Sequence, residues 1–168
     1  YARRSTKSIS EAIDHLLVAT NLDSNFAEAW AELSDAYRSL ASYSGQNENQ
    51  LIQRAREAVD RALELNAQLS EPHTSLATLL QSQGDYAGAI LSIKRALDRN
   101  PNNAAARLRY GDLLHETGKV QSSLLEFEKA AKLDPLSPFV VSAYAFTLAE
   151  VGRFDEALSR HRIVVKLD

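Results

Sequence analysis

Apolar and small residues recur through the second half of the chain at a fixed interval of 34 residues. Gly84, Gly118 and Gly152 keep this interval. Further registers keep the same step: Leu76, Tyr110 and Tyr144; Ala77, Gly111 and Ala145; Tyr86, Val120 and Phe154; Ala89, Ser123 and Ala157; and Ala96, Ala130 and Val164. A period of this size indicates a chain that stacks one supersecondary unit repeatedly and does not close a single compact core.

In unit 70–103 the pattern predicts two helices joined by a tight turn. The first begins at a Ser70 cap and has Pro72 in its first turn, where the missing N–H does no harm. Gly84 ends this helix, because glycine can take a positive φ. The second helix follows at once, carries apolar residues at helical spacing, and stops before Pro101.

Units 104–137 and 138–168 repeat this arrangement. Asn103 is expected to cap the first helix of the former unit. Ser137 and Pro138 begin the latter with a cap followed by proline at the first helical position. Each unit therefore predicts a helical hairpin with a glycine in its turn.

Unit 27–69 departs from the period. Ala19 and Ala62 occupy the same register but lie 43 residues apart, so this unit carries about nine extra residues. The surplus falls in the polar stretch 42–50. This stretch forms either a longer surface loop or an added helical turn, or else a protruding contact for a partner, since insertions in repeat arrays gather on one face.

Both ends of the chain depart as well. Residues 1–26 predict a partial repeat, in which 8–22 form a second helix and only 1–5 remain of the helix before it. No polar helix closes the other end, and a solenoid needs its terminal faces covered. We therefore expect a segment of a longer protein. The uncovered C-terminal face includes Leu158, Val164, Val165 and Leu167.

Trp30, Leu33, Ser34 and Tyr37 show the W-x2-L-G-x2-Y pattern of the tetratricopeptide repeat, with serine in the glycine position. Together with the period, this pattern makes the chain resemble the tetratricopeptide repeat family over nearly all of residues 1–168. The resemblance implies one all-α domain, a right-handed α-solenoid of antiparallel helix pairs. In each pair we name the first helix A and the second helix B.

Proteins of this family bind partners in a concave groove lined by their A helices. Transferring that register gives thirteen candidate groove residues: Glu28, Asp35, Arg38, Glu71, Thr74, Thr78, Leu108, Asp112, His115, Glu116, Phe139, Phe146 and Glu150. The resemblance thus implies an acidic groove with an apolar spot around Leu108, Phe139 and Phe146. The alternative is that the acidic residues only solvate this face.

Family members that clamp a C-terminal carboxylate use Lys, Arg and Asn on these faces. The corresponding positions here hold Ala31, Asp35, Thr74, Thr78, Leu108 and Asp112. This departure argues against an adaptor for acidic chain ends. We therefore expect the partner to be a basic or apolar segment of a protein or peptide.

Three segments resemble repeat regions of multidomain bacterial signalling and transcriptional regulator proteins. They are FAEAWAELSDAY at 26–37, AREAVDRALELN at 55–66 and KLDPLSP at 132–138. In such proteins the repeats follow a winged-helix, cyclase or kinase domain and act in sensing or interaction. The resemblance implies a soluble segment, cytoplasmic by default and periplasmic in a membrane-anchored regulator.

Composition excludes several classes of function. The net charge is −3, and general nucleic-acid binding needs a basic face. No apolar run approaches about 18 residues, so we expect no membrane insertion. The chain has no cysteine, which excludes disulfides and thiolate metal sites. We expect neither a metal nor a cofactor.

Catalytic chemistry finds little support. The sequence contains no G-x-S-x-G, P-loop or H-E-x-x-H motif, and its four histidines lie in different registers. His161 is interpreted as a core or boundary residue, Glu126 and Glu128 as a solvated edge, and Arg107 and Arg109 as surface salt-bridge partners. We therefore expect an interaction scaffold that is not an enzyme. The alternative is a self-assembly module, a homo-oligomer joined through its terminal faces.

Overall fold

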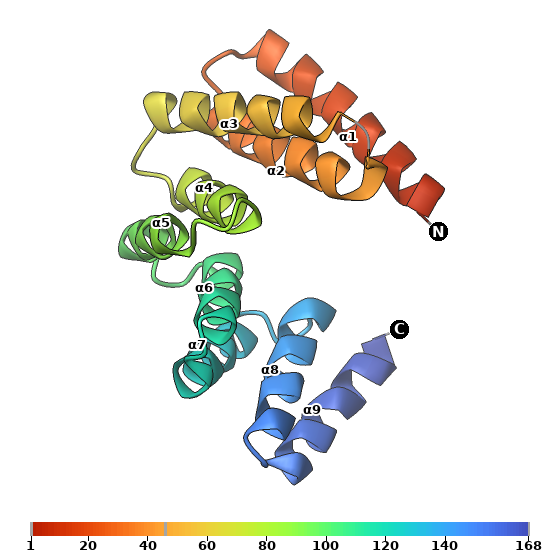
Figure 1. Ribbon diagram of the computed structural model, residues 1–168, viewed down its shortest axis with the longest axis vertical. Helices are drawn as coiled ribbons and strands as arrows, with labels where there is room; N and C mark the ends of the chain where they lie inside the picture. The colour runs from red at the N-terminus through yellow and green to blue at the C-terminus, as the bar shows by residue number, and fades with distance from the viewer. Residues whose placement is uncertain (1, 46, 168) are drawn as a thin grey trace. The chain divides into compact units, whose positions relative to one another are not determined.

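The computed structural model describes the backbone of residues 2–45 and 47–167, and the side chains of residues 6–45 and 47–162. All regular secondary structure in this part of the chain is α-helical, which confirms the predicted class (Figure 1). The helices are α1 (Ala2–Leu22), α2 (Ala27–Ser44), α3 (Glu48–Leu65), α4 (Ser70–Ser82), α5 (Tyr86–Arg99), α6 (Ala104–Glu116), α7 (Val120–Leu133), α8 (Pro138–Glu150) and α9 (Phe154–Leu167).

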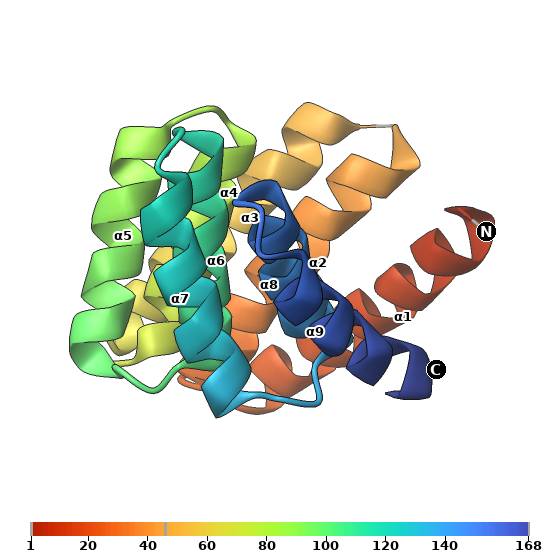
Figure 2. The same cartoon turned by 90° about the horizontal axis from the view of Figure 1, so that it is seen from below.

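The chain forms two compact units, residues 1–92 and 93–168, whose boundary lies within α5. In the first unit, α2 packs against α1, α3 and α4, and α3 also contacts α4 (Figure 1). In the second unit, α6 pairs with α7, α7 contacts α8, and α8 pairs with α9 (Figure 2). Consecutive helices therefore pack in sequential pairs, as the period predicts.

The core of the first unit draws one or two large apolar side chains from each of its first four helices. Ile13 of α1, Leu33 and Tyr37 of α2, Val59 of α3 and Leu79 of α4 are all buried in one cluster. A fully buried side chain of this size stabilises the fold by about 1.5–3 kcal/mol. The family-type residues Leu33 and Tyr37 are thus core residues.

The core of the second unit forms where α8 lies on α7. Leu124 and Phe127 of α7 are buried against Val140, Tyr144 and Leu148 of α8. The three α8 residues are four positions apart, so they line one stripe of the helix. This stripe covers the face that the α6–α7 pair would otherwise expose.

The same turn closes three of the hairpins. The glycine of each of these turns takes a left-handed backbone: Gly84 (φ 80°), Gly118 (φ 75°) and Gly152 (φ 81°). After α6, the N–H of Gly118 donates to His115 O (2.9 Å) and the N–H of Lys119 donates to Leu114 O (2.8 Å). These two bonds define a Schellman motif, and the chain makes the equivalent pair 34 residues earlier and later. The predicted glycine turns are confirmed.

Two predicted N-caps are also confirmed. Asn103 accepts a hydrogen bond from the N–H of Ala106 at 2.9 Å, and Ser137 accepts one from the N–H of Val140 at 3.5 Å. Each side chain satisfies an N–H that the first turn of its helix leaves without a partner.

The predicted Ser70 cap is wrong. The cap of α4 is Leu69, and Ser70 is the first helical residue, only 3% exposed. The Ser70 carbonyl accepts the Thr74 hydroxyl at 3.0 Å, as a residue within a helix can. Ser70 is therefore a buried residue of the first helical turn, and its side chain does not cap the helix.

The predicted break before residue 8 is also wrong. Residues 2–5 belong to the same helix as 8–22, since α1 begins at Ala2. No glycine or proline stands in the first ten residues to end a helix there. The packed face of α1 centres on the buried Ile13, with Ile9, Leu16 and Leu17 beside it.

The surplus residues of unit 27–69 lengthen two helices. Helices α2 and α3 have 18 residues each, whereas α6 and α7 have 13 and 14. Gly45, with a left-handed backbone, ends α2, and α3 begins at Glu48. The stretch 42–50 therefore adds helical turns, which was one of the two structural alternatives. A role in partner contact stays a prediction.

Small and large residues fit together where α6 meets α7. A Cβ atom on Gly111 would overlap the ring of Phe127, which is itself 3% exposed. Glycine in a helix interior costs up to about 1 kcal/mol relative to alanine. The close packing of Phe127 therefore explains why glycine stands at position 111, since helix propensity disfavours it.

The interpretation of Glu126 as a solvated residue is wrong. Glu126 is 8% exposed, and its carboxylate lies 2.7 Å from Arg107 Nη1 and 2.7 Å from Lys129 Nζ. A buried carboxylate requires such partners, because desolvation of an unpaired charge is costly. Glu128, on the other side of Phe127, is more exposed and pairs with Lys132, as expected for a surface edge.

The left-handed glycines generate the first prediction. Replacing Gly118 by alanine should cost about 1–2 kcal/mol, because an L-residue is strained at this φ. The added Cβ meets nothing within 4 Å, so backbone strain alone is measured. Thermal unfolding should show a lower Tm, by about 2–4 °C per kcal/mol. The exposed change Gln121→Ala is the control, and unchanged melts for Gly84→Ala, Gly118→Ala and Gly152→Ala would contradict the turn.

Candidate functional site

The A-helix face of the first unit carries charge on α2 and α4. Glu28 and Glu71 are exposed, while Asp35 and Arg38 are half-buried. Asp35 accepts a hydrogen bond of 2.8 Å from the Ser75 hydroxyl, and its other oxygen lies 3.8 Å from Arg38 Nε. Asp35 therefore joins α2 to α4 as well as contributing charge to this face.

The two predicted threonines contribute little to that face. Thr74 donates its hydroxyl to Ser70 O and Thr78 donates to Thr74 O, both at 3.0 Å. Thr78 is only 8% exposed. Both hydroxyls therefore donate to backbone carbonyls of α4. The acidic side chains are thus the main groups of this face that could bind a ligand.

Glu32 belongs to the same acidic group, although the sequence prediction omits it. Its partial burial raises its pKa, and the negative charges of Asp35 and Glu71 raise that pKa further. Glu32 lies four residues after Glu28 and three before Asp35, so helical spacing was a sufficient signal to find it.

In the second unit, the A helices α6 and α8 form two adjoining hollows of about 370 Å³ each. Asp112 and Ala143 line both of them. Six of the predicted residues line these hollows: Leu108, Asp112, His115, Glu116, Phe139 and Phe146. We call this surface the α6–α8 groove. The structure thus brings together nearly all the predicted residues of this unit.

Two aromatic side chains in the α6–α8 groove face solvent. Phe139 is 81% exposed and Phe146 is 67% exposed. The Phe146 ring meets the His115 ring edge-on, with 6.2 Å between centroids. Large apolar side chains this exposed leave most of their burial energy to be gained on contact with another molecule.

The acidic residues of the groove have partners that the sequence prediction did not assign. Asp112 lies 3.3 Å from Arg109, which confirms Arg109 as a salt-bridge residue. His115 Nε2 lies 2.6 Å from Glu150 Oε2 and connects α6 to α8. The groove remains acidic, but its field is weaker than the predicted residues alone would produce.

The folded state disfavours the ionised form of Asp112, although Arg109 pairs with it. Burial raises the pKa of its carboxyl, Arg109 lowers it, and Glu116 raises it again, with a net rise above the ordinary value near 3.8. Keeping this carboxylate ionised at neutral pH therefore costs the fold stability. Perturbed pKa values of this kind cluster at functional sites.

The remaining chemistry is limited in the part of the chain that the structure describes. No group of three or more His, Asp or Glu side chains there is arranged to hold a metal ion. None of the described helices combines the length and the apolar character needed to cross a membrane. Of the other histidines, His73 is buried and bonds Ala67 O through Nε2, while His15 and His161 are exposed. The interpretation of His161 as a core or boundary residue is therefore wrong.

The predicted self-assembly face is described only in part. Leu158 is 57% exposed on α9. The side chains of Val164, Val165 and Leu167 lie outside the described residues. Association through this face therefore stays a prediction, as does a single groove that continues from the first unit to the second.

Residues 74–138 match the model of the tetratricopeptide repeat family. The matched segment contains α6 and α7 complete, with the glycine turn between them. Residues 74–138 are therefore a tetratricopeptide repeat region. A comparison with curated protein sequences found no match.

Solved structures with the same fold include two proteins described as tetratricopeptide repeat proteins, TTC0263 and YrrB, and also MamA. TTC0263 from Thermus thermophilus has a TM-score of 0.75 and 18% identity, over 88% of this chain and 78% of its own. MamA has a TM-score of 0.65 and 18% identity, over 98% and 91%. YrrB, described as having an unusual peptide-binding site, has a TM-score of 0.60 and 20% identity, over 98% and 80%. At these identities the likeness establishes the fold.

The raised pKa of Asp112 generates the second prediction. The native state binds the proton more tightly than the unfolded chain, so stability should fall as pH rises from the ordinary aspartate pKa through the raised one. Asp112→Asn removes this cost. Thermal melts should therefore show a higher Tm for Asp112→Asn at pH 7, and the difference should shrink as the pH is lowered towards 3.8.

Glu128→Gln is a control of opposite sign. A hydrogen bond from Lys132 lowers the pKa of Glu128, so its charge helps the fold at neutral pH, and the change should lower the Tm slightly. A lower Tm for Asp112→Asn at pH 7 would contradict the inference that the ionised Asp112 carboxylate destabilises the fold.

Proposed function

We propose that this chain is a tetratricopeptide repeat protein throughout, and that it is a non-enzymatic interaction scaffold that binds a protein segment on its A-helix faces. The observation that carries the proposal is the α6–α8 groove, where exposed aromatic rings stand beside acidic side chains over two adjoining hollows. A surface of this kind favours binding of a partner, because burial of exposed apolar side chains lowers the free energy.

The side chains of the groove define the partner. Phe139 and Phe146 would pack against apolar residues, and Asp112 and Glu116 would attract a lysine or arginine. The segment is therefore both basic and apolar, and either extended or helical. An affinity of about 1 μM corresponds to roughly 8 kcal/mol, and a few anchors of this type can supply most of it.

Two further observations support a binding role. YrrB, which shares the fold, is described as having a peptide-binding site. In the first unit, Glu32, Asp35 and Glu71 raise the local negative potential on the equivalent helices, and mutual repulsion contributes to the raised pKa of Glu32. A basic ligand would relieve that repulsion, which favours the same class of partner.

We further propose that the chain serves a multidomain bacterial signalling or transcriptional regulator. The support is the resemblance of segments 26–37, 55–66 and 132–138 to repeat regions of such proteins. The lengthened α2 and α3 would then offer a second contact surface near Gly45. The coding sequence on either side of this chain tests the context, since it should encode an effector domain such as a winged helix.

The groove generates the third prediction. A peptide-display selection on the wild-type chain should enrich segments that combine Lys or Arg with large apolar residues. The double change Asp112→Lys and Glu116→Lys should weaken binding of the selected peptides by about tenfold or more, since it replaces attraction by repulsion. Binding to the wild type should also weaken with added salt, as fluorescence anisotropy can measure.

The double change Asp98→Lys and Asp155→Lys is the matched control. Both residues are exposed acids on B helices of the second unit, and the pair alters the net charge by the same amount. Peptide binding should survive this control. Selected peptides that bind equally well to both double variants would remove the groove from consideration.

A further inference from the structure

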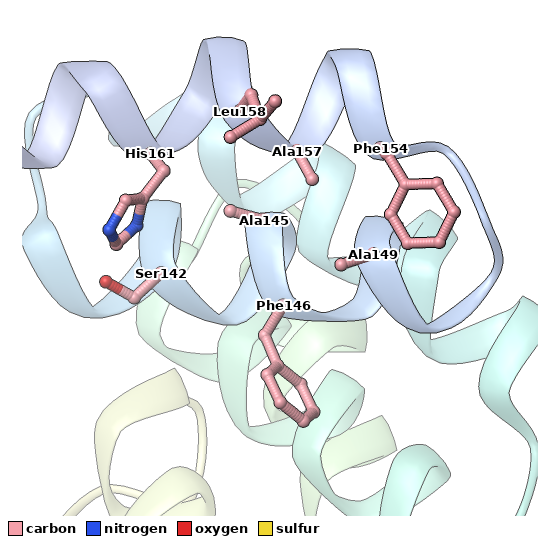
Figure 3. Close-up of a pocket in the computed structure, with 8 residues that line it drawn as sticks. All are labelled: Ser142, Ala145, Phe146, Ala149, Phe154, Ala157, Leu158 and His161. Atoms are coloured by element: carbon pink, nitrogen blue, oxygen red, sulfur yellow. The ribbon is translucent and has the colours of Figure 1, made fainter.

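The first unit carries a hollow of about 430 Å³ that is lined from α1, α2 and α3. We call it the α1–α3 hollow. Its lining combines apolar and aromatic side chains with two arginines, Arg54 and Arg61. By contrast, the hollow between α8 and α9 is lined mainly by apolar side chains, and its described lining includes no Asp, Glu, Lys or Arg (Figure 3). Charge therefore gives the α1–α3 hollow a selectivity for ligands that the other hollow lacks.

Aromatic and aliphatic side chains form the apolar part of the α1–α3 hollow. Leu33 and Tyr37 are buried, at 1% and 6% exposure, whereas Leu17 and Trp30 are half-buried. The indole N–H of Trp30 donates to Ser24 O at 3.1 Å, which orients the ring. The hollow thus offers apolar surface to a side chain of a ligand.

Arg54 contacts an aromatic ring and has no acidic partner. Its Cζ lies over the Tyr37 ring, 5.7 Å from the centroid. Among the described residues, no carboxylate lies within ion-pair distance of its exposed guanidinium, whereas Arg56 of the same helix pairs with Asp60. A ring beneath a guanidinium occupies its face and leaves the N–H groups at its edge able to donate. Arg54 can therefore bind a carboxylate of another molecule.

Arg61 adds a second positive charge on the same side of α3. It follows Arg54 by seven residues, which is about 10.5 Å along the helix and two full turns. Arg61 pairs with Glu64 at 3.2 Å, but the pair is exposed and therefore weak, and a guanidinium has enough N–H donors for a second carboxylate. Glu57 lies between the two arginines and accepts a hydrogen bond from Gln53 Nε2 at 3.0 Å. Its charge disfavours an acid at the centre of the hollow.

The repeat itself places a carboxylate at the equivalent position of the second unit. Ala58 and Arg61 precede Glu126 and Lys129 by two periods of 34 residues. The buried Glu126 carboxylate lies 2.7 Å from Lys129 Nζ and 2.7 Å from Arg107 Nη1. In the first unit this register holds the buried Ala58, which lines the hollow and supplies no acid. An acidic side chain of a ligand can take the equivalent place beside Arg61.

We propose that the α1–α3 hollow binds an acidic segment of a partner protein, with carboxylates on both sides of a large apolar side chain. The carboxylates would pair with Arg54 and Arg61, and the apolar side chain would pack on Leu17 and Trp30. Charge complementarity selects this partner, because the two arginines outnumber Glu57 in the lining. The segment is opposite in charge to the one proposed for the α6–α8 groove, so the two sites select different ligands.

Trp30 makes the test specific for this hollow, because it is the chain's one tryptophan and lines the hollow itself. The probe is the tryptophan-free peptide Gly-Ser-Glu-Leu-Phe-Glu-Ser-Gly, whose two carboxylates span about 10 Å when it is extended. Its titration into the full chain should change the emission of Trp30 saturably, and added salt should weaken the binding. A peptide with both Glu replaced by Gln should bind about fivefold more weakly or worse, since it cannot form charge-assisted hydrogen bonds with the arginines.

Arg54→Gln should weaken binding of the acidic peptide by about fivefold or more. Arg95→Gln is the matched control, because Arg95 is an exposed arginine of α5 that does not line the hollow, and this variant should bind like the wild type. Thermal melts should show both variants folded, since each replaces an exposed side chain. Asp112→Lys with Glu116→Lys should leave the Trp30 response unchanged, so failure of the groove and failure of the α1–α3 hollow are distinguishable.

Three results would overturn the proposal. The absence of a saturable change in Trp30 emission up to about 1 mM peptide would show that the hollow does not accept such a segment. Equal binding by the wild type and Arg54→Gln would show that this arginine does not select the ligand. Light scattering that reveals a concentration-dependent oligomer of the wild type, lost in Arg54→Gln, would show that a second copy of the chain fills the hollow.

Discussion

A helical hairpin can bury only one side of its apolar surface by itself, and the rest of this structure follows from that constraint. Each pair depends on the next helix to cover what it leaves open, as α8 covers Leu124 and Phe127. The glycine turns hold the two helices of a pair close enough to share a core, and small residues such as Gly111 let the rings of the partner helix approach. The stability of each helix pair thus depends on its contacts with the neighbouring pairs.

The same constraint separates the polar residues into two groups. Glu126 lies between helices, where desolvation demands partners, and Arg107 and Lys129 supply them. Asp112 and Glu32 lie on A-helix faces, where they are partly buried, and their raised pKa values indicate charge that the fold does not fully compensate. The first group serves packing. The second group leaves electrostatic attraction available to a ligand, which is why the A-helix faces carry the proposed function.

Two surfaces of the second unit therefore differ in chemistry although they share α8. The α6–α8 groove combines acids with exposed rings, whereas the hollow between α8 and α9 is lined mainly by apolar side chains. Phe146 contributes to both, so a ligand on one surface could alter the side chain that the other uses.

The sequence by itself determined the helix pairs, the positions of their turns and most residues of the α6–α8 groove, because glycine spacing and helical periodicity are local properties. Only the tertiary structure decided which polar residues are compensated. Glu126 is buried in an ion pair with Arg107 of α6, and Asp35 of α2 accepts a hydrogen bond from Ser75 of α4. These outcomes depend on which side chains from other helices come within a few ångströms, and periodicity along one helix carries no information about that distance.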